Sequence, residues 1–86
     1  MRTPARWFYL SFADDERGGF LGGIYIEANG PLTASRRAHM LSINPGGQVL
    51  TVEMPSGYPL PPPEYRERLL TKAEIQALDD AVSALH

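Results

Sequence analysis

Residues 7–13 read Trp-Phe-Tyr-Leu-Ser-Phe-Ala, and the predicted fold is built outward from them. The run alternates between two sets of side chains and is rich in aromatic rings, which is typical of a β-strand with two faces. One face carries Phe8, Leu10 and Phe12, and the opposite face carries Trp7, Tyr9 and Ser11. The first set predicts a hydrophobic core on its side of a sheet, and the second leaves aromatic rings on the other side.

A second strand is predicted directly downstream, so that the first two strands form a hairpin. Residues 14–19 (Asp-Asp-Glu-Arg-Gly-Gly) are polar and contain glycines that can adopt a positive φ, as a turn requires. The strand then runs from Phe20 to Ala28. Gly22 and Gly23 lie inside it and predict a bulge or the close approach of another backbone.

A helix follows the hairpin. Pro31 suits its first turn, because the missing N–H of proline would have no partner there. Ala34, Ala38 and Leu41 form a narrow face of small side chains that can lie close to a sheet. The helix must end near residues 42–43, since the Asn-Pro-Gly-Gly sequence after them cannot continue it.

Residues 48–54 predict a third strand, with Leu50, Val52 and Met54 on the core side together with Ile24 and Ile26. If the second and third strands are neighbours, the intervening helix makes them a parallel pair joined by a right-handed crossover. The opposite side of the sheet is then predicted to carry Trp7, Tyr9, Ser11, Tyr25, Glu27, Thr51 and Glu53.

The last third of the chain is predicted to be a connector and a helix. Residues 55–63 are rich in proline and indicate an extended connector. A short helical turn is expected from Pro63 through Leu70. Thr71 and Glu74 form a capping-box pattern for the final helix. The apolar residues that mark this helix as amphipathic are Ile75, Leu78, Val82 and Leu85.

These elements predict one α+β domain over residues 1–86, in the order ββαβα. Its parts are a ββαβ core at 7–54, the connector at 55–63 and a C-terminal helical segment at 64–86. One helix covers the hydrophobic face of a three-stranded sheet. The aromatic face must be covered by the C-terminal helix, by a second subunit or by a ligand, because so much exposed ring surface would promote aggregation.

Composition and charge exclude several function classes. The net charge of −2 argues against a general nucleic-acid binder, which needs a strongly basic surface. The absence of cysteine excludes disulfides and thiolate metal sites. No apolar run approaches the ~20 residues of a membrane span. The N-terminal residues are too few and too aromatic for a signal peptide, so a cytoplasmic protein is expected.

The sequence predicts neither a metal site nor an enzyme. The acidic turn at residues 14–16 lacks a full set of calcium ligands, and His39 and His86 are too isolated for zinc. None of the serines lies in a nucleophile elbow. Glu27 and Glu53 could act as acid and base on adjacent strands, but charged residues at the rim of a sheet explain them more simply. We therefore expect no cofactor.

Basic and glycine-rich segments point to an anion. Arg36 and Arg37 lie on the first helix, and arginine binds phosphate through two parallel hydrogen bonds. The sequence Asn44-Pro45-Gly46-Gly47 could expose consecutive backbone N–H groups to an anion, although a plain turn between helix and strand is the simpler interpretation. Together with the aromatic face, the candidate ligand-binding residues are Trp7, Tyr9, Tyr25, Glu27, Arg36, Arg37, Asn44, Gly46, Gly47 and Glu53.

Four segments within residues 7–54 carry a resemblance. They are residues 7–14, the Phe-Leu-Gly-Gly sequence at 20–23, Arg-Ala-His at 37–39 and Ile-Asn-Pro-Gly-Gly at 43–47. The pattern resembles small uncharacterised proteins of bacteriophages and of prophage-bearing bacteria. That resemblance implies a non-enzymatic antagonist of host defence, but it assigns no residue a role.

Two hypotheses follow for the function. The first is a homo-oligomeric protein that binds and sequesters a nucleotide-derived signalling molecule, with rings stacked on the base and arginines on the phosphate. The alternative is a protein–protein inhibitor or adaptor that acts through its acidic turn and its proline-rich connector without a small ligand.

Overall fold

The elements of the structure follow one another in the predicted order. They are β1 (Arg6–Ala13), β2 (Phe20–Ala28), α1 (Pro31–Met40), β3 (Gln48–Glu53), a 3-10 turn η1 (Pro63–Tyr65) and α2 (Lys72–Ala84). This computed structural model describes residues 6–55 and 57–84, and side chains up to residue 81. The predicted Val82 and Leu85 contacts of the last helix lie outside the described side chains. The predicted α+β fold with a three-stranded sheet is confirmed.

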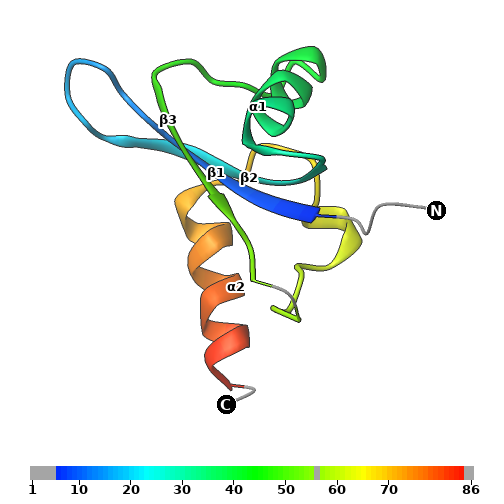
Figure 1. Cartoon of the computed structure of the whole chain (residues 1–86). Helices are drawn as coiled ribbons and strands as arrows, with labels where there is room; N and C mark the ends of the chain where they lie inside the picture. The colour runs from blue at the N-terminus through cyan, green and yellow to red at the C-terminus, as the bar shows by residue number, and fades with distance from the viewer. Residues whose placement is uncertain (1–5, 56, 85–86) are drawn as a thin grey trace.

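The aromatic strand β1 is the middle strand of the sheet. The strand order is β2-β1-β3, and both neighbours run antiparallel to β1. β2 and β3 therefore point in the same direction but are not neighbours, so the parallel pair that required their adjacency does not form. Figure 1 shows α1 on one side of this sheet and α2 on the other.

The core lies between β1, β2 and α1. Residues Phe8, Leu10 and Phe12 of β1 are buried opposite Ile26, Ile24 and Gly22 of β2. Ala34 and Ala38 are the buried residues of α1, and their small side chains let the helix lie close to the rings. The predicted core face is thus confirmed for β1, for Ile24 and Ile26 of β2 and for the two alanines of the helix. The prediction that Leu41 extends this face is wrong, because α1 ends at Met40 and Leu41 is 47% exposed.

The predicted orientation of β3 is wrong. In the observed register Val52 lies opposite Tyr9 and Leu50 opposite Ser11, so both belong to the aromatic face and not to the core. Thr51 lies opposite Leu10 and Glu53 opposite Phe8, so these two lie on the α1 face. Leu50 and Val52 make one side of β3 the more apolar, and Val49 is the apolar residue on the other side, so alternation alone assigned the wrong side to the core. Met54 follows the same register, because its N–H bonds to the carbonyl of Trp7.

Gly47 fixes where β3 begins. Its φ is +75°, and a Cβ atom there would lie 2.1 Å from the carbonyl oxygen of Ala13. Only glycine allows this combination of positive φ and close backbone approach. The preceding Gly46 also has a positive φ of +87°, but a Cβ atom there would meet open space.

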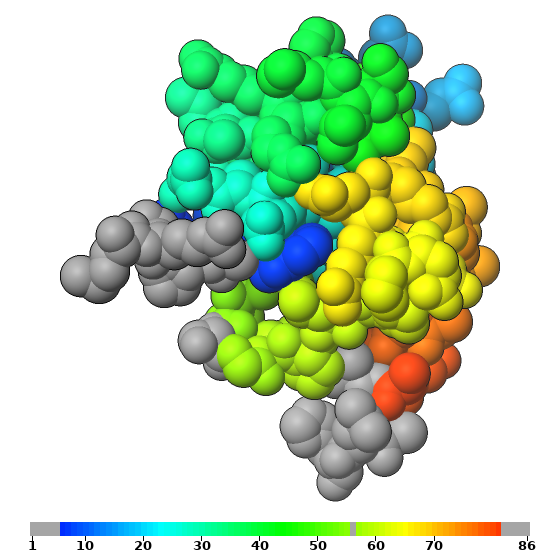
Figure 2. Space-filling view, turned by 90° about the vertical axis from the view of Figure 1, so that its right-hand side faces the viewer, coloured from blue at the N-terminus to red at the C-terminus, as the bar shows by residue number. Residues whose placement is uncertain are grey.

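The outer edge of β2 is covered by residues 66–70, which we call the edge segment. Gly23 and Leu70 exchange two backbone hydrogen bonds of 3.1 and 2.8 Å, and the N–H of Glu67 donates to the carbonyl of Tyr25 at 2.7 Å. The close approach of another backbone that Gly22 and Gly23 predicted is confirmed, since Gly23 bonds to Leu70 and a Cβ atom on Gly22 would lie 2.9 Å from the carbonyl oxygen of Leu70. Figure 2 shows these yellow residues packed between α1 above and α2 below.

The edge segment corrects the helical turn predicted for residues 63–70. Only Pro63–Tyr65 is helical, and the chain then becomes extended so that it can pair with β2. Glu67 turns it with a φ of +55°, which is unusual for a residue other than glycine. The carboxylate of Glu67 forms an ion pair of 2.6 Å with Arg37 of α1. Leu70 is fully buried at the end of the segment.

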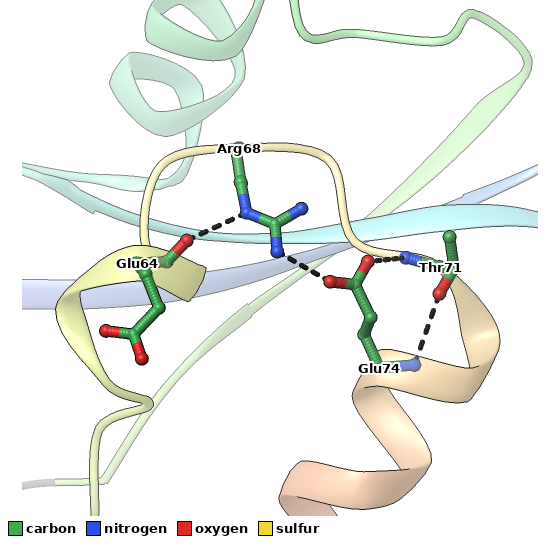
Figure 3. A network of polar contacts seen from close by, with 4 residues as sticks. All are labelled: Glu64, Arg68, Thr71 and Glu74. Carbon is green, nitrogen blue, oxygen red and sulfur yellow. Dashed lines mark hydrogen bonds and ion pairs between the residues drawn. The ribbon is translucent and has the colours of Figure 1, made fainter.

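The predicted capping box starts α2 (Figure 3). The Thr71 hydroxyl accepts a hydrogen bond from the N–H of Glu74 at 3.2 Å, and the Glu74 carboxylate accepts one from the N–H of Thr71 at 3.0 Å. Arg68 adds a 2.5 Å contact to the same carboxylate and donates to the carbonyl of Glu64 at 2.8 Å. These contacts, with the Arg68 bond first, hold the pKa of Glu74 below its ordinary value. The network joins η1 to α2.

Substitutions of the two glycines before β3 test the close approach at Ala13. We expect Gly46→Ala to lower the free energy of unfolding by about 1 kcal/mol, the cost of a left-handed residue with a side chain. Gly47→Ala adds a backbone collision and should cost about 2–4 kcal/mol in total. Urea denaturation of both variants measures the difference. Equal losses would contradict the role given to Gly47.

Candidate functional site

The α2 helix covers the aromatic face only in part. A Cβ atom on Gly23 would lie 2.8 Å from Ile75 Cδ1 and 2.6 Å from the Tyr9 hydroxyl, so α2 packs over β2 with the Tyr9 ring beside it. Tyr25 is buried there, at 8% exposed. Trp7 lies nearer the start of β1, where the guanidinium of Arg66 stacks over its ring at 5.5 Å. The sequence left three possible covers for the aromatic face: the C-terminal helix, a second subunit or a ligand. Over β2 the cover is the C-terminal helix.

Two adjoining cavities lie where this cover ends. One, of about 250 Å³, lies between β3 and α2, and the other, of about 210 Å³, lies between the connector and α2. Tyr25, Tyr58 and Asp79 line both of them. We call this surface the tyrosine groove, and its further lining residues used below are Tyr9, Val52, Glu53 at the end of β3, Met54, Ile75 and Leu78. Of the predicted site residues, Tyr9, Tyr25 and Glu53 thus line one cavity.

The rings of Tyr9 and Tyr25 form the floor of the groove. Their centroids are 5.1 Å apart and their planes are tilted by 45°. Tyr58 at the groove mouth is 42% exposed, and the adjacent Val52 is 47% exposed. Large apolar side chains are thus present on the surface beside the cavities, as is typical of a binding site.

The groove carries negative charge. Burial raises the pKa of the Tyr25 hydroxyl to about 12, and the nearby Tyr9, Asp79 and Tyr58 add to the shift. Burial also raises the pKa of Tyr9, with Asp79 contributing in the same direction. Among the described residues that line the two cavities, none is a lysine or an arginine. A groove with an aspartate and three electron-rich rings favours a cation over an anion.

The predicted arginines lie on the other side of the sheet. Arg37 contacts the carboxylate of Glu67 and donates to the backbone carbonyl of Glu27, so it fastens α1 to the edge of β2. Arg36 is exposed on α1 and lines an open depression of about 400 Å³ together with His39 and Asn44. Neither arginine lines the two cavities that Tyr9 and Tyr25 line.

The Asn-Pro-Gly-Gly turn has a structural role in the chain. The side-chain oxygen of Asn44 accepts a hydrogen bond from the N–H of Gly46 at 2.7 Å, so this amide already has a partner. Gly46 and Gly47 both have positive φ, whereas an anion nest requires residues of opposite hand. This geometry matches the simpler interpretation of a turn between helix and strand.

The two glutamates are on opposite faces of the sheet. Glu27 lies opposite Trp7, whereas Glu53 lies opposite Phe8. Arg6 binds the Glu53 carboxylate through contacts of 2.6 and 3.0 Å, and this hydrogen bonding lowers the Glu53 pKa. The pairing of Glu27 and Glu53 as acid and base therefore has no geometric basis.

Tyr58 and Asp79 are functional candidates that sequence reasoning missed. Tyr58 lies in the connector and Asp79 in the middle of α2, and no local motif links them. The sequence offered two weak signals: Tyr58 is a lone aromatic residue among prolines, and Asp79 is a carboxylate one helical turn after Ile75. Both are common in surfaces without a ligand, so only the packing of α2 identifies them.

The described part of the chain holds no cluster of three metal-ligating side chains. The turn carboxylate of Asp14 instead accepts hydrogen bonds from the N–H groups of Glu16 and Arg17 at 2.8 and 2.9 Å, which lower its pKa. No helix among the described residues has the length and apolar character needed to cross a membrane. Comparisons with protein-family models, curated proteins and solved structures find no match for this chain.

The burial of Tyr25 predicts a specific alkaline response. Its hydroxyl ionises more easily in the unfolded chain than in the folded one, so the free energy of unfolding should fall between pH 10 and about 12. Tyr25→Phe removes the ionising group, and the fall in this window should be smaller. Urea unfolding at a series of pH values compares the two proteins. Identical slopes would show that Tyr25 is not buried as described.

Proposed function

We propose that this protein is a non-enzymatic binding protein whose tyrosine groove takes a basic side chain of a polypeptide partner. The observation that carries the proposal is the composition of the groove: three tyrosines and Asp79 around two adjoining cavities, with no described basic residue among the lining. This choice corresponds to the inhibitor or adaptor hypothesis. The proposed binding surface is the groove in place of the acidic turn, and the proline-rich connector still forms part of that surface.

A lysine or arginine side chain complements this surface in two ways. Its aliphatic stem can lie against Val52, Ile75 and Leu78, while its cationic end meets the Asp79 carboxylate and the tyrosine rings. Contacts between a cation and an aromatic face contribute about 0.5–2 kcal/mol each, and more when water is excluded. The exposed Tyr58 and Val52 extend the contact area for apolar neighbours of that residue.

A displayed library of random peptides tests the proposal, because it samples every combination of basic and apolar residues at once. We expect selected peptides to carry lysine or arginine between apolar residues. Asp79→Lys should weaken their binding at least about tenfold, because it reverses the one charge of the groove that has no described ion-pair partner. Tyr58→Ala should weaken it as well.

Asp80→Lys is the matched control. It changes the net charge equally on the same helix, but Asp80 does not line the groove and instead contacts the Gln76 side chain at 3.1 Å. Binding to this variant should equal that of the unmodified protein. Selected peptides without basic residues, or equal losses in the two aspartate variants, would refute the proposal.

One observation favours nucleotide binding as a second candidate function. Arg36, His39 and Asn44 line one depression, which could hold a phosphate group. None of the described aromatic residues lines it, so the base of a nucleotide would have no ring to stack on within one chain. Calorimetry with a panel of cyclic and linear nucleotides, with Arg36→Ala as control, tests this candidate. Heat of nucleotide binding that the unmodified protein shows and Arg36→Ala lacks would favour nucleotide binding over the groove proposal.

The resemblance of residues 7–54 to bacteriophage proteins adds a biological context to the proposal. On that resemblance we propose that the partner is a protein of a bacterial host and that binding counters host defence. A cytoplasmic location follows from the same proposal.

A further inference from the structure

One edge of the sheet is covered and the other is open among the described residues. The outer edge of β2 is covered by the edge segment and by Arg37, which together bond to Gly23, Tyr25 and Glu27. β3 forms the other edge, and no strand pairs with its outer side among the described residues. An uncovered edge strand presents a row of unpaired backbone groups to any chain that can pair with it.

The outward-facing groups of β3 can be identified from the register. Met54 donates its N–H to Trp7, so alternate residues back from Met54 bond to β1. The N–H and carbonyl groups of Val49, Thr51 and Glu53 therefore point away from the sheet. None of the described residues forms a backbone hydrogen bond with these groups.

The side chains of β3 do not protect this edge. Val49, Leu50 and Val52 are 41%, 65% and 47% exposed. Gln48–Glu53 contains no proline and no lysine, and its pairing with β1 shows no bulge. Natural edge strands that must stay single commonly carry at least one of these devices. The edge is therefore open to a partner strand.

We propose that β3 pairs with β3 of a second copy of this chain, so that two sheets join into one six-stranded sheet. A two-fold axis at Thr51 brings Val49 opposite the partner's Glu53 and Leu50 opposite the partner's Val52. All outward-facing groups from Val49 to Glu53 are then satisfied by about six hydrogen bonds. The proposal concerns the edge of the sheet and does not require a ligand in the groove, and Val52 is the residue that belongs to both surfaces.

The sequence of β3 is complementary to itself in this register. On the groove face the exposed leucine and valine of one copy lie opposite the valine and leucine of the other, which are favourable cross-strand pairs. The two Glu53 carboxylates are kept apart, because each lies opposite a valine and stays bound to Arg6 of its own chain. No like charges face one another across the seam. A second copy thus fits this edge better than a strand of unrelated sequence.

The interface is a single strand pair, so it belongs to the small, reversible class of contacts. Analytical ultracentrifugation of the full chain over a range of concentrations should show a monomer–dimer equilibrium. Leu50→Lys should raise the dissociation constant of the dimer at least tenfold. Since Leu50 is 65% exposed, the circular dichroism spectrum of the variant should remain unchanged.

Two double variants test the register itself. Leu50→Lys with Val52→Glu places opposite charges across the seam and should restore dimerisation relative to Leu50→Lys alone. Leu50→Lys with Val52→Lys places like charges there and should remain monomeric. Dimerisation that is equal in both double variants would overturn the proposed pairing.

Amide hydrogen exchange provides a second measurement. The N–H groups of Val49, Thr51 and Glu53 should become protected as the concentration rises, whereas those of Leu50 and Val52 bond to β1 and should be protected at all concentrations. A protein that stays monomeric at every concentration, or whose outer amides exchange freely in the dimer, would contradict the proposal. Asp79→Lys should leave the equilibrium unchanged, so failure of the groove proposal is distinguishable from failure of this one.

Discussion

The structure depends on one buried contact, the packing of three alternate side chains of the central strand against two alanines of α1. Phe8, Leu10 and Phe12 are almost completely buried, and Ala34 and Ala38 are small enough to let the helix backbone approach them. Because β1 is hydrogen-bonded on both sides, this contact also fixes the faces of β2 and β3. A small domain can bury only one such core, and here it lies on one side of the sheet.

The other side of the sheet is consequently left with a thinner cover, and the groove is the result. α2 packs over β2, where Gly23 gives it room beside Tyr9, and a cavity separates it from β3. The connector then brings Tyr58 to the open half, next to Val52. The same asymmetry explains why the arginines and the tyrosines do not meet. Arg36 and Arg37 lie on α1 at one face of the sheet, whereas the rings of Tyr9 and Tyr25 project from β1 and β2 on the other face.

The sequence predicted the elements well where a pattern was unambiguous. Alternation in residues 7–13, the turn at 14–19 and the Thr71–Glu74 capping box each allowed a single interpretation, and the structure confirms them. β3 was assigned to the wrong face because Leu50 and Val52 form its more apolar side, which the pattern places in the core, whereas the observed register places them on the aromatic face. The groove could not be predicted, since it depends on how Tyr58 and Asp79, far apart in the chain, pack against β1 and β2. No local pattern encodes such a distance.

The pairing of Leu70 with Gly23 has a consequence for folding of the chain during its synthesis on the ribosome. The strand at residues 20–28 is made early, but its outer border is closed by residues that are translated more than forty positions later. Until then the backbone groups of Gly23 and Tyr25 on this border of β2 have no partner from the edge segment, although β3 can already pair with β1 on the other side of the hairpin. Loop closure over such a separation is slow relative to helix formation. The final third of the chain is therefore part of the folding unit. A truncated translation product that ends after β3 would keep an unpaired β2 edge and would be prone to aggregate.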